Sequence, residues 1–304
     1  MTRRFDRAAV ENTPLRRKKQ SPDHDHFGMR LAEMTAPGRA EASPTQNEEF
    51  TVKFSKLLRL AAGIATWVLT STSLPAAQTN VAVAANFTEA AREIAAAFKA
   101  KTGHEAVLSF GASGQFYTQI TQDAPFQVFL SADDTRPKKL VDDGLAVPGS
   151  RFTYAIGKLV LWSKTPNLVK GEATLKAASF AKLAICNPVA APYGAAAVET
   201  MKSLEIYDVL KPKLVEGATI TQAYQFVETG NAEVGFVALS QLTGPETGSR
   251  WLVPQELYSP IRQDAVLLKS GASNEAAIAF IAFLRSPEAR VIIEKYGYAL
   301  DGQS

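Results

Sequence analysis

From residue 80 to the C-terminal end, short apolar runs with strand character alternate with stretches of helical periodicity. The first run, Asn80–Ala84, precedes a helical stretch at Thr88–Lys101, and the strongest amphipathic pattern is Asn274–Arg285. Strands that alternate with helices are typical of an α/β fold with a largely parallel sheet. This alternation excludes all-helical and all-β folds for most of the chain.

Two of the apolar runs, 156–161 and 259–266, are placed so that they can cross between two α/β lobes. We therefore expect a first lobe at 78–157 and 265–304, and a second lobe at 158–264. A ligand cleft between the lobes would face the carboxyl ends of the strands, where open α/β sheets bind ligands. The long apolar run 154–162 contains the first crossing. The expected strands are 80–84, 106–110, 126–131, 183–186, 219–220, 234–237 and 258–268; the expected helices are 88–101, 115–122, 135–143, 194–204, 222–229, 274–285 and 288–296.

The first quarter of the chain does not have the pattern of a folded domain. Residues 1–51 are rich in charged residues and proline without an apolar period, which indicates a disordered or mis-annotated extension. Residues 52–77 combine a basic start, the apolar run Leu60–Leu69 and a small-residue exit, as a secretory signal peptide does. The run is shorter than the roughly 20 residues of a membrane span. We expect export to the periplasm, with translation starting near Val52.

Charge argues against nucleic acid and membrane surfaces as partners. The formal net charge of the whole chain is +3. After Ala77, 21 basic residues (33 minus 12) face 22 acidic ones (30 minus 8), so the positive excess lies in the predicted leader and extension. A near-neutral exported chain has no broad basic surface for DNA or anionic lipid.

Enzymatic and metal chemistry have little support in the residues. Cys186 is the single cysteine and falls in an apolar run, so a buried, inert thiol is expected. His104 is the one histidine after the leader. The stretch Gly111–Gln115 resembles a nucleophile elbow, but its second glycine comes one residue early. Asp133 is expected to start a helix rather than act as a catalytic carboxylate. We expect neither an enzyme nor a resident cofactor.

Four short stretches each end a strand pattern and open a helix with small or hydroxyl-bearing residues. Such starts leave backbone N–H groups free, and the helix dipole favours negative charge there. None of the four contains a charged residue, which indicates a pocket for a small oxyanion with neutral donors. They are Ala84–Thr88, Phe110–Gly114, Ala191–Gly194 and Ala218–Thr221.

Each stretch also has an alternative explanation that needs no ligand. Asn86 and Ser113 could act only as helix caps. Against this, Gly111 and Gly114 would let a ligand approach the backbone closely. Gly194 would leave a bare amide, and the hydroxyl of Tyr193 would supply a side-chain donor.

Several motifs together resemble the periplasmic molybdate-binding proteins of ABC transporters, and the resemblance covers residues 80–300. It implies a two-lobed class II periplasmic binding protein fold with the ligand in the cleft. It also implies an inner-membrane ABC permease as partner and a monomer. The motifs are Phe110–Gly114, Leu130–Asp133, Pro192–Gly194, Val234–Val237 and the C-terminal segment Phe280–Tyr298.

The resemblance implies that molybdate or tungstate is held through its oxygens, without direct coordination of the metal. The residues at the family's ligand positions are Asn86, Ser113, Tyr193 and Ile220, the last through its backbone amide, with Ala85 as a weaker backbone candidate. One branch of the family has a tyrosine donor where this chain has Ala238. The chain is similar to the other branch, with Tyr193 across the pocket.

A fully deprotonated dianion has only acceptors, so each group that lines its pocket must donate. Sulfate has the same charge and shape and differs mainly in size. A sulfate or thiosulfate carrier therefore remains an alternative. The ligand-sensing domain of a transcription regulator is a second one, although the predicted leader and the lack of a helix-turn-helix pattern in residues 1–50 count against it.

Overall fold

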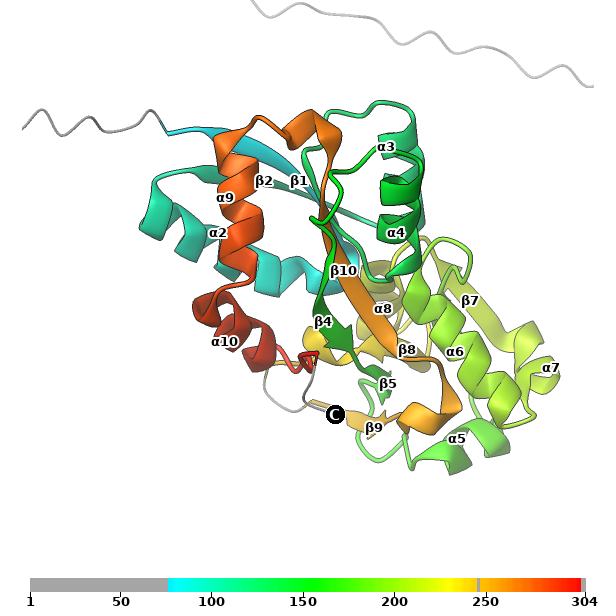
Figure 1. Cartoon of the computed structure of the whole chain (residues 1–304). Helices are drawn as coiled ribbons and strands as arrows, with labels where there is room; N and C mark the ends of the chain where they lie inside the picture. Colours follow the sequence, from blue (N-terminus) through cyan, green and yellow to red (C-terminus); the bar gives the residue numbers. More distant parts are fainter. Residues whose placement is uncertain (1–75, 245–246, 302–304) are drawn as a thin grey trace, which may run out of the picture. The chain divides into compact units, whose positions relative to one another are not determined.

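The computed structural model describes residues 76–244 and 247–301, and all of them belong to one compact unit, Ser71–Ser304 (Figure 1). Two five-stranded sheets organise this part of the chain. We call the sheet formed by β1–β4 and β10, with its helices, the first lobe, and the sheet formed by β5–β9, with its helices, the second lobe.

The first sheet has the strand order β2-β1-β3-β10-β4. β1 pairs in parallel with β2 and β3, whereas β10 is antiparallel to both β3 and β4. The carboxyl ends of β1 and β2 therefore lie at the same edge of the sheet. The strands are β1 Gln78–Ala84, β2 Glu105–Gly111, β3 Val128–Leu130, β4 Phe152–Gly157 and β10 Ile261–Leu267.

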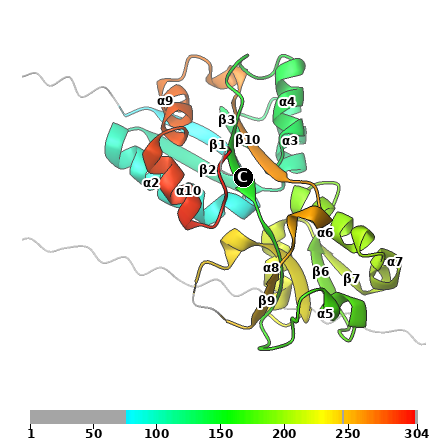
Figure 2. The ribbon, with the colours of Figure 1, turned by 60° about the horizontal axis from the view of Figure 1, so that its bottom comes forward.

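Helices cover both faces of the first sheet, as Figures 1 and 2 show. Successive residues of a strand point to opposite faces. Val81 and Val83 belong to the core under α2, α9 and α10, while Ala82 between them belongs to the core under α3 and α4. The helices are α2 Thr88–Thr102, α3 Ser113–Thr121, α4 Thr135–Asp142, α9 Glu275–Leu284 and α10 Pro287–Lys295.

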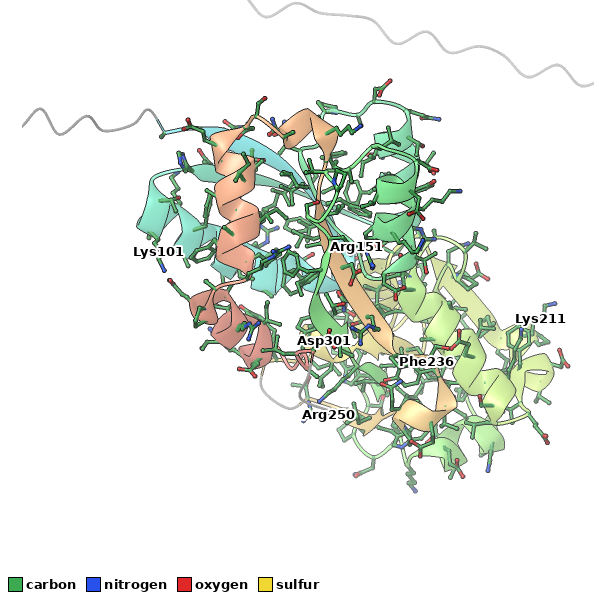
Figure 3. All side chains as sticks on the ribbon, in the orientation of Figure 1. Lys101, Arg151, Lys211, Phe236, Arg250 and Asp301 are labelled. Atoms are coloured by element: carbon green, nitrogen blue, oxygen red, sulfur yellow. The ribbon has the colours of Figure 1, made fainter. Side chains whose placement is uncertain are left out.

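The second sheet has the order β7-β6-β8-β5-β9, with β6 parallel to β7 and β8. Trp162 and Phe236 are buried in its core, and Figure 3 labels Phe236 within this lobe. In Figure 2, α8 lies on one side of the sheet, and α6 and α7 lie on the other. The elements are β5 Leu159–Ser163, β6 Leu183–Cys186, β7 Leu214–Gly217, β8 Val234–Ala238, β9 Ser249–Leu252, α5 Glu172–Ala177, α6 Pro192–Ser203, α7 Tyr207–Leu210 and α8 Ile220–Glu228.

The long apolar run 154–162 forms parts of two strands, because the chain passes from β4 in the first sheet to β5 in the second sheet at Lys158. The short strand predicted at 219–220 is wrong: Ile220 opens α8, and the strand before it is β7. β7 was missed because Glu216 breaks its apolar pattern. The short elements β9, α5 and α7 were also not predicted.

The second crossing also lies earlier than expected, because β10 begins at Ile261 and runs to Leu267 entirely within the first sheet. The residue limits of the lobes stay a prediction, but the limit set at 264/265 would divide this strand. A limit at 260/261 keeps β10 whole. The predicted extension, and all of the predicted leader before residue 76, lie outside the described residues. None of the described helices has the length and apolar character that a membrane span needs.

Candidate functional site

Five connections, one after each of β1, β2, β3, β6 and β7, meet at a small cavity between the lobes. Its walls carry no charged side chain, and polar groups among small apolar ones are all that face it. The lining residues are Ala84, Ala85, Asn86, Gly111, Ala112, Ser113, Ala132, Ala191, Pro192, Tyr193 and Ile220.

The five residues singled out from the sequence all lie in the wall of this cavity: Ala85, Asn86, Ser113, Tyr193 and Ile220. All five are buried, with at most 8% of their surface exposed. The chain brings them together from positions up to 135 apart (220 minus 85). Their role as ligand contacts stays a prediction.

Ser113 is the first residue of α3, and Ala112 takes the N-cap position. The alternative explanation that Ser113 is a helix cap is therefore wrong. Its Oγ instead accepts the backbone N–H of Ala132 at 2.9 Å. A hydroxyl that accepts one hydrogen bond still has its proton to donate. This contact orients the oxygen and leaves the Ser113 proton for a group in the cavity.

Asn86 lies in η1, the 3-10 helix Ala85–Phe87 between β1 and α2. Asn86 does not cap α2 either, because the N-cap residue of that helix is Phe87 and no side chain caps it. The Nδ2 of Asn86 donates to Gln263 Oε1 at 2.8 Å and to the Tyr298 hydroxyl at 3.0 Å. An amide nitrogen has two protons, so both are engaged in the wall. The backbone N–H of Asn86 is the donor that remains.

Tyr193 differs most from the expectation. Its ring is buried, and its hydroxyl accepts a hydrogen bond from Gln263 Nε2 at 3.3 Å. The hydroxyl lies against Gly157, where an added Cβ would come within 2.1 Å of the oxygen. It therefore points to the crossing between the lobes. Burial raises the pKa of Tyr193 well above its ordinary value, so the phenol stays protonated.

The backbone of Tyr193 is the part that opens α6. Ala191 is the N-cap and Pro192 the first helical residue, which has no N–H. Gly194 donates its N–H to Ala191 O at 2.9 Å, so it is not the bare amide expected from the sequence. Its small size has another cause: an added Cβ would lie 2.1 Å from Cys186 O. Gly194 allows α6 to start directly against β6.

Ile220 is the first residue of α8, with Thr219 as N-cap. The Thr219 hydroxyl accepts the N–H of Gln222 at 3.2 Å, as an N-cap side chain does. The N–H of a first helical residue has no partner within its helix. Ile220 thus presents a main-chain donor to the cavity, and its carbonyl accepts Gln241 Nε2 at 3.3 Å.

Hydrogen bonds between the lobes surround the cavity. At one rim, Gly114 donates its N–H to Ala190 O at 2.9 Å, and Arg136 Nη2 donates to Val189 O at 2.8 Å. An added Cβ on Gly114 would lie 3.1 Å from Ala190, so this glycine serves the contact between the lobes rather than a ligand. On another side, Ser240 Oγ donates to Asn86 O at 2.8 Å.

The centre of a water molecule can reach about 10 Å³ of this cavity. That space corresponds to roughly one water molecule. A tetrahedral oxyanion has five atoms and is larger, so the walls must move apart to admit one. The bonds between the lobes are therefore part of any binding equilibrium.

A larger groove of about 790 Å³ lies beside the cavity and shares Ala132 and Pro192 with it. Its walls carry charges, among them Lys139. α4 begins at Thr135 with Asp134 as N-cap, so Asp133 does not itself start the helix; it lies just before it, accepts the backbone N–H of Arg136 at 2.8 Å and pairs with its guanidinium. The convergent donors belong to the small cavity, so we place the candidate site there.

Metal and thiol chemistry have no centre in the described part of the chain. Within residues 76–244 and 247–301, no group of three or more His, Cys, Asp or Glu side chains is arranged to hold a metal ion. Cys186 is buried, as expected, and burial is the main cause that raises its pKa to about 12. The thiol is therefore unreactive at neutral pH.

Sequence reasoning missed Gln263 and Ala132. The amide of Gln263 contacts Asn86 and Tyr193, which lie 177 and 70 residues away in the chain. A glutamine within a predicted strand gives no local signal of such contacts. Ala132 acts through its backbone N–H, but it lies before the start of α4, so the helix-start pattern does not indicate it. The motif Leu130–Asp133 was the only pointer to it.

The chain is similar to known proteins over most of the described residues. The family model "Bacterial extracellular solute-binding protein" matches residues 79–299. A protein of Rhodobacter capsulatus named molybdate-binding protein ModA is 57% identical over 251 residues, which cover 82% of this chain and 99% of that protein. The protein of the same name from Azotobacter vinelandii is 55% identical over 232 residues, covering 74% and 91% of the two chains.

The solved structure of the periplasmic molybdate-binding protein of Azotobacter vinelandii superimposes on this one with a TM-score of 0.71. The superposition covers 73% of this chain and 99% of that chain, at 42% identity. The two-lobed class II solute-binding fold predicted from the resemblance is thereby confirmed. The chain belongs to the family of bacterial extracellular solute-binding proteins.

Proposed function

We propose that this protein captures molybdate in the cavity between its lobes and delivers it to an ABC transporter permease. The observation that carries the proposal is the uncharged cavity at which five strand-to-helix connections converge. The names of the relatives from Rhodobacter capsulatus and Azotobacter vinelandii, at 57% and 55% identity, support the choice of molybdate.

The donors that would hold the anion are four backbone N–H groups and one hydroxyl. The hydroxyl is that of Ser113, oriented by Ala132 N–H. The N–H groups are those of Ala85, Asn86, Tyr193 and Ile220, all in the cavity wall. In a site closed to water, each such bond is stronger than in solution. We assign Tyr193 to the site through its backbone, because its hydroxyl lies against Gly157 at the crossing between the lobes, where it accepts Gln263 Nε2.

The same donor set fits tungstate, which is also a tetrahedral dianion, and we include it among the ligands. It disfavours protonated phosphate, because an O–H of the ligand needs an acceptor such as a carboxylate, and no carboxylate lines the cavity. Sulfate matches in charge and shape. Its exclusion depends on the distance between the two walls, which closure of the lobes sets.

Transport rather than catalysis is consistent with the surroundings of Ser113. The partner of its hydroxyl is the Ala132 N–H, and an amide cannot act as the base that a nucleophilic serine requires. We propose that the protein works in the periplasm as a monomer, exported by the leader at 52–77. Closure over the anion would form the surface that the inner-membrane permease recognises.

Calorimetric titration of the purified chain with molybdate, tungstate, sulfate and phosphate tests this proposal. We expect tight binding of molybdate and tungstate at one site per chain, weak binding of sulfate and none of phosphate. Equal affinity for sulfate and molybdate would replace the proposal with a sulfate carrier. Binding of none of the four anions would overturn it.

A further inference from the structure

Behind the cavity, one buried glutamine contacts residues of both lobes. Gln263 lies in β10 with no exposed surface. Its Oε1 accepts Asn86 Nδ2 at 2.8 Å and lies 3.1 Å from the Tyr154 hydroxyl, while its Nε2 donates to the Tyr193 hydroxyl at 3.3 Å. We call Gln263, Asn86, Tyr154 and Tyr193 the glutamine cluster. Its members come from β10, η1, β4 and α6, so the cluster spans the two lobes.

The backbone around Gln263 is shaped to direct this side chain inward. The pairing of β10 with β4 shifts register between Gln263 and Asp264, as at a β-bulge. Bulges re-aim side chains and are frequent beside functional sites. On the far side of the bulge, Asp264 is 1% exposed, pairs with Arg151 and accepts the Thr153 hydroxyl at 2.7 Å. Figure 3 labels Arg151 in the first lobe.

Gly157 makes room for the cluster at the end of β4. An added Cβ there would lie 2.7 Å from Gln263 Nε2 and 2.1 Å from the Tyr193 hydroxyl. Gly157 immediately precedes Lys158, where the chain leaves the first sheet. The bond between Gln263 and Tyr193 therefore joins the first lobe to the start of α6 beside the crossing.

The two residues that Gln263 joins are both in the wall of the cavity, one from each lobe. Both Nδ2 protons of Asn86 are engaged, by Gln263 and Tyr298, and the Tyr193 hydroxyl lies against Gly157, where it accepts Gln263 Nε2. What they present to the cavity is their main chain. The side-chain amide of Gln263 is thus bonded to the residues of two main-chain donors on opposite sides of the cavity, beside the bonds that Tyr298 and Ser240 make to Asn86.

We infer that Gln263 is a positioning residue for oxyanion capture, which ties Asn86 of the first lobe to Tyr193 of the second so that their backbone N–H groups face one ligand. The inference rests on the proposed function and adds to it the group that sets the spacing of the two walls. Gln263 itself does not contact the anion. Its contribution is to the closed form, so its loss speeds release of the anion.

Gln263→Met tests this, because methionine has a similar length and keeps the packing while removing all three polar contacts. Gln127→Met is the matched control. Gln127 lies in the first lobe just before β3 and does not line the cavity; its Oε1 accepts a hydrogen bond of 3.1 Å from the Asn80 N–H. Molybdate affinity is measured by calorimetry, the dissociation rate by stopped-flow displacement, and the fold by circular dichroism and thermal unfolding without anion.

We expect Gln263→Met to lose at least about tenfold in molybdate affinity, equivalent to about 1.4 kcal/mol, mainly through faster dissociation. Gln127→Met stays within about twofold of the parent protein. A merely structural role would lower the unfolding temperature and leave the dissociation rate unchanged. A dissociation rate of Gln263→Met equal to that of Gln127→Met would therefore overturn the inference.

Tyr193→Phe removes the bond between Gln263 and Tyr193 from the side of the second lobe. It tests the role of this bond in anion release if Gln263→Met does not fold. We expect the double variant to bind no more weakly than Gln263→Met alone, because both changes remove one bond. Losses that add fully would overturn the inference. If Gln263→Met does not fold, Tyr193→Phe must release molybdate faster than the parent protein, and an unchanged rate would overturn the inference.

If the parent protein binds no molybdate, the proposed function fails, and small-angle scattering without anion then tests the tie between the lobes by itself. Gln263→Met should then be more extended than Gln127→Met, or Tyr193→Phe more extended than the parent protein if Gln263→Met does not fold. Equal dimensions in the pair compared would overturn the inference.

Discussion

The two walls of the cavity offer donors of different kinds. The wall of the first lobe has a side-chain donor, the hydroxyl of Ser113, which the backbone of Ala132 orients. The wall of the second lobe is formed by the starts of α6 and α8, where Tyr193 and Ile220 present only main-chain N–H groups. The side-chain donor of the first wall therefore depends on which residue occupies position 113. The main-chain donors of the second wall depend on where α6 and α8 begin.

Because of this difference, substituting a residue that contacts the ligand need not weaken binding in the second lobe, where the donors are main-chain groups. In the second lobe, a change of side chain at a ligand position removes no donor. A change that shifts the helix start removes two features at once: the direction of the N–H groups and the alignment of the helix dipole. The predictions below use this contrast.

Gly194→Ala should have the largest effect. The new Cβ would lie 2.1 Å from Cys186 O, and both groups belong to rigid elements. We expect the free energy of unfolding to fall by about 3 kcal/mol and molybdate binding to fall more than for any other change below. Urea denaturation and calorimetry measure the two effects. Gly244→Ala is the control, because nothing lies within 4 Å of an added Cβ there; equal behaviour of the two variants would contradict the role of α6.

Ser113→Ala should come next, with weaker binding and a loss of stability, because the buried Ala132 N–H loses its acceptor. It removes the one side-chain donor and leaves an oxygen of the anion unpaired, at a cost of about 1–3 kcal/mol. Calorimetry with molybdate measures the change in dissociation constant. Thr121→Ala is the matched control, an exposed hydroxyl at the end of the same helix. An unchanged affinity in Ser113→Ala would remove the side-chain donor from the first wall.

Tyr193→Phe should have a smaller effect than Ser113→Ala, less than about tenfold in affinity (1.4 kcal/mol). The donor of Tyr193 in our assignment is its backbone N–H, which phenylalanine retains. What is lost is the bond from Gln263 Nε2, 3.3 Å long. A loss that equals or exceeds that of Ser113→Ala would show that the phenol itself faces the anion, and the contrast between the walls would then fail.

Changing the pH should have the smallest effect on binding. No side chain that titrates near neutrality lines the cavity, and burial raises the pKa of the Tyr193 phenol well above its ordinary value. Between pH 7 and 9, the molybdate dissociation constant should stay within about twofold, because neither wall changes its charge. A transition in affinity within that range would reveal a titrating donor.

Stability, in contrast, should fall at alkaline pH. Burial raises the pKa values of Tyr154, Tyr193 and Tyr298 in the folded chain. Their neutral form is favoured by folding, so this contribution is fully present below the unfolded value of about 10. It is lost as the pH rises above that value, because only the unfolded chain then releases these protons. Thermal unfolding at pH 8 and 10.5 would show the difference.

The sequence predicted the alternation of strands and helices and the segments that meet at the cavity, because strand ends and helix starts are local properties. The choice of Ala85, Asn86, Ser113, Tyr193 and Ile220 within these segments came from the family resemblance, and all five lie in the cavity wall. Short elements such as β9 were missed because their apolar pattern is weak. The change of sheet at Lys158 falls at the expected lobe limit of 157/158, whereas the limit expected at 264/265 falls inside β10.

The way in which each residue works was less predictable, because it depends on partners far along the chain. The orientations of Asn86 and Tyr193 follow from Gln263, and that of Ser113 follows from Ala132. Glycines were misread for the same reason. Positions 114 and 194 require glycine because the backbones of Ala190 and Cys186 leave no room for a side chain there. Nothing near these glycines in the sequence reveals such neighbours.

The absence of charge from the cavity wall has a consequence for unloading. A buried lysine or arginine would attract the anion strongly, but it would be left as a bare cation in a dry pocket once the cargo departed, which is costly. Amides and hydroxyls can exchange an oxyanion for water with little electrostatic penalty. A carrier with such walls can hand over its ion as soon as the halves separate, without a counter-charge to recapture it.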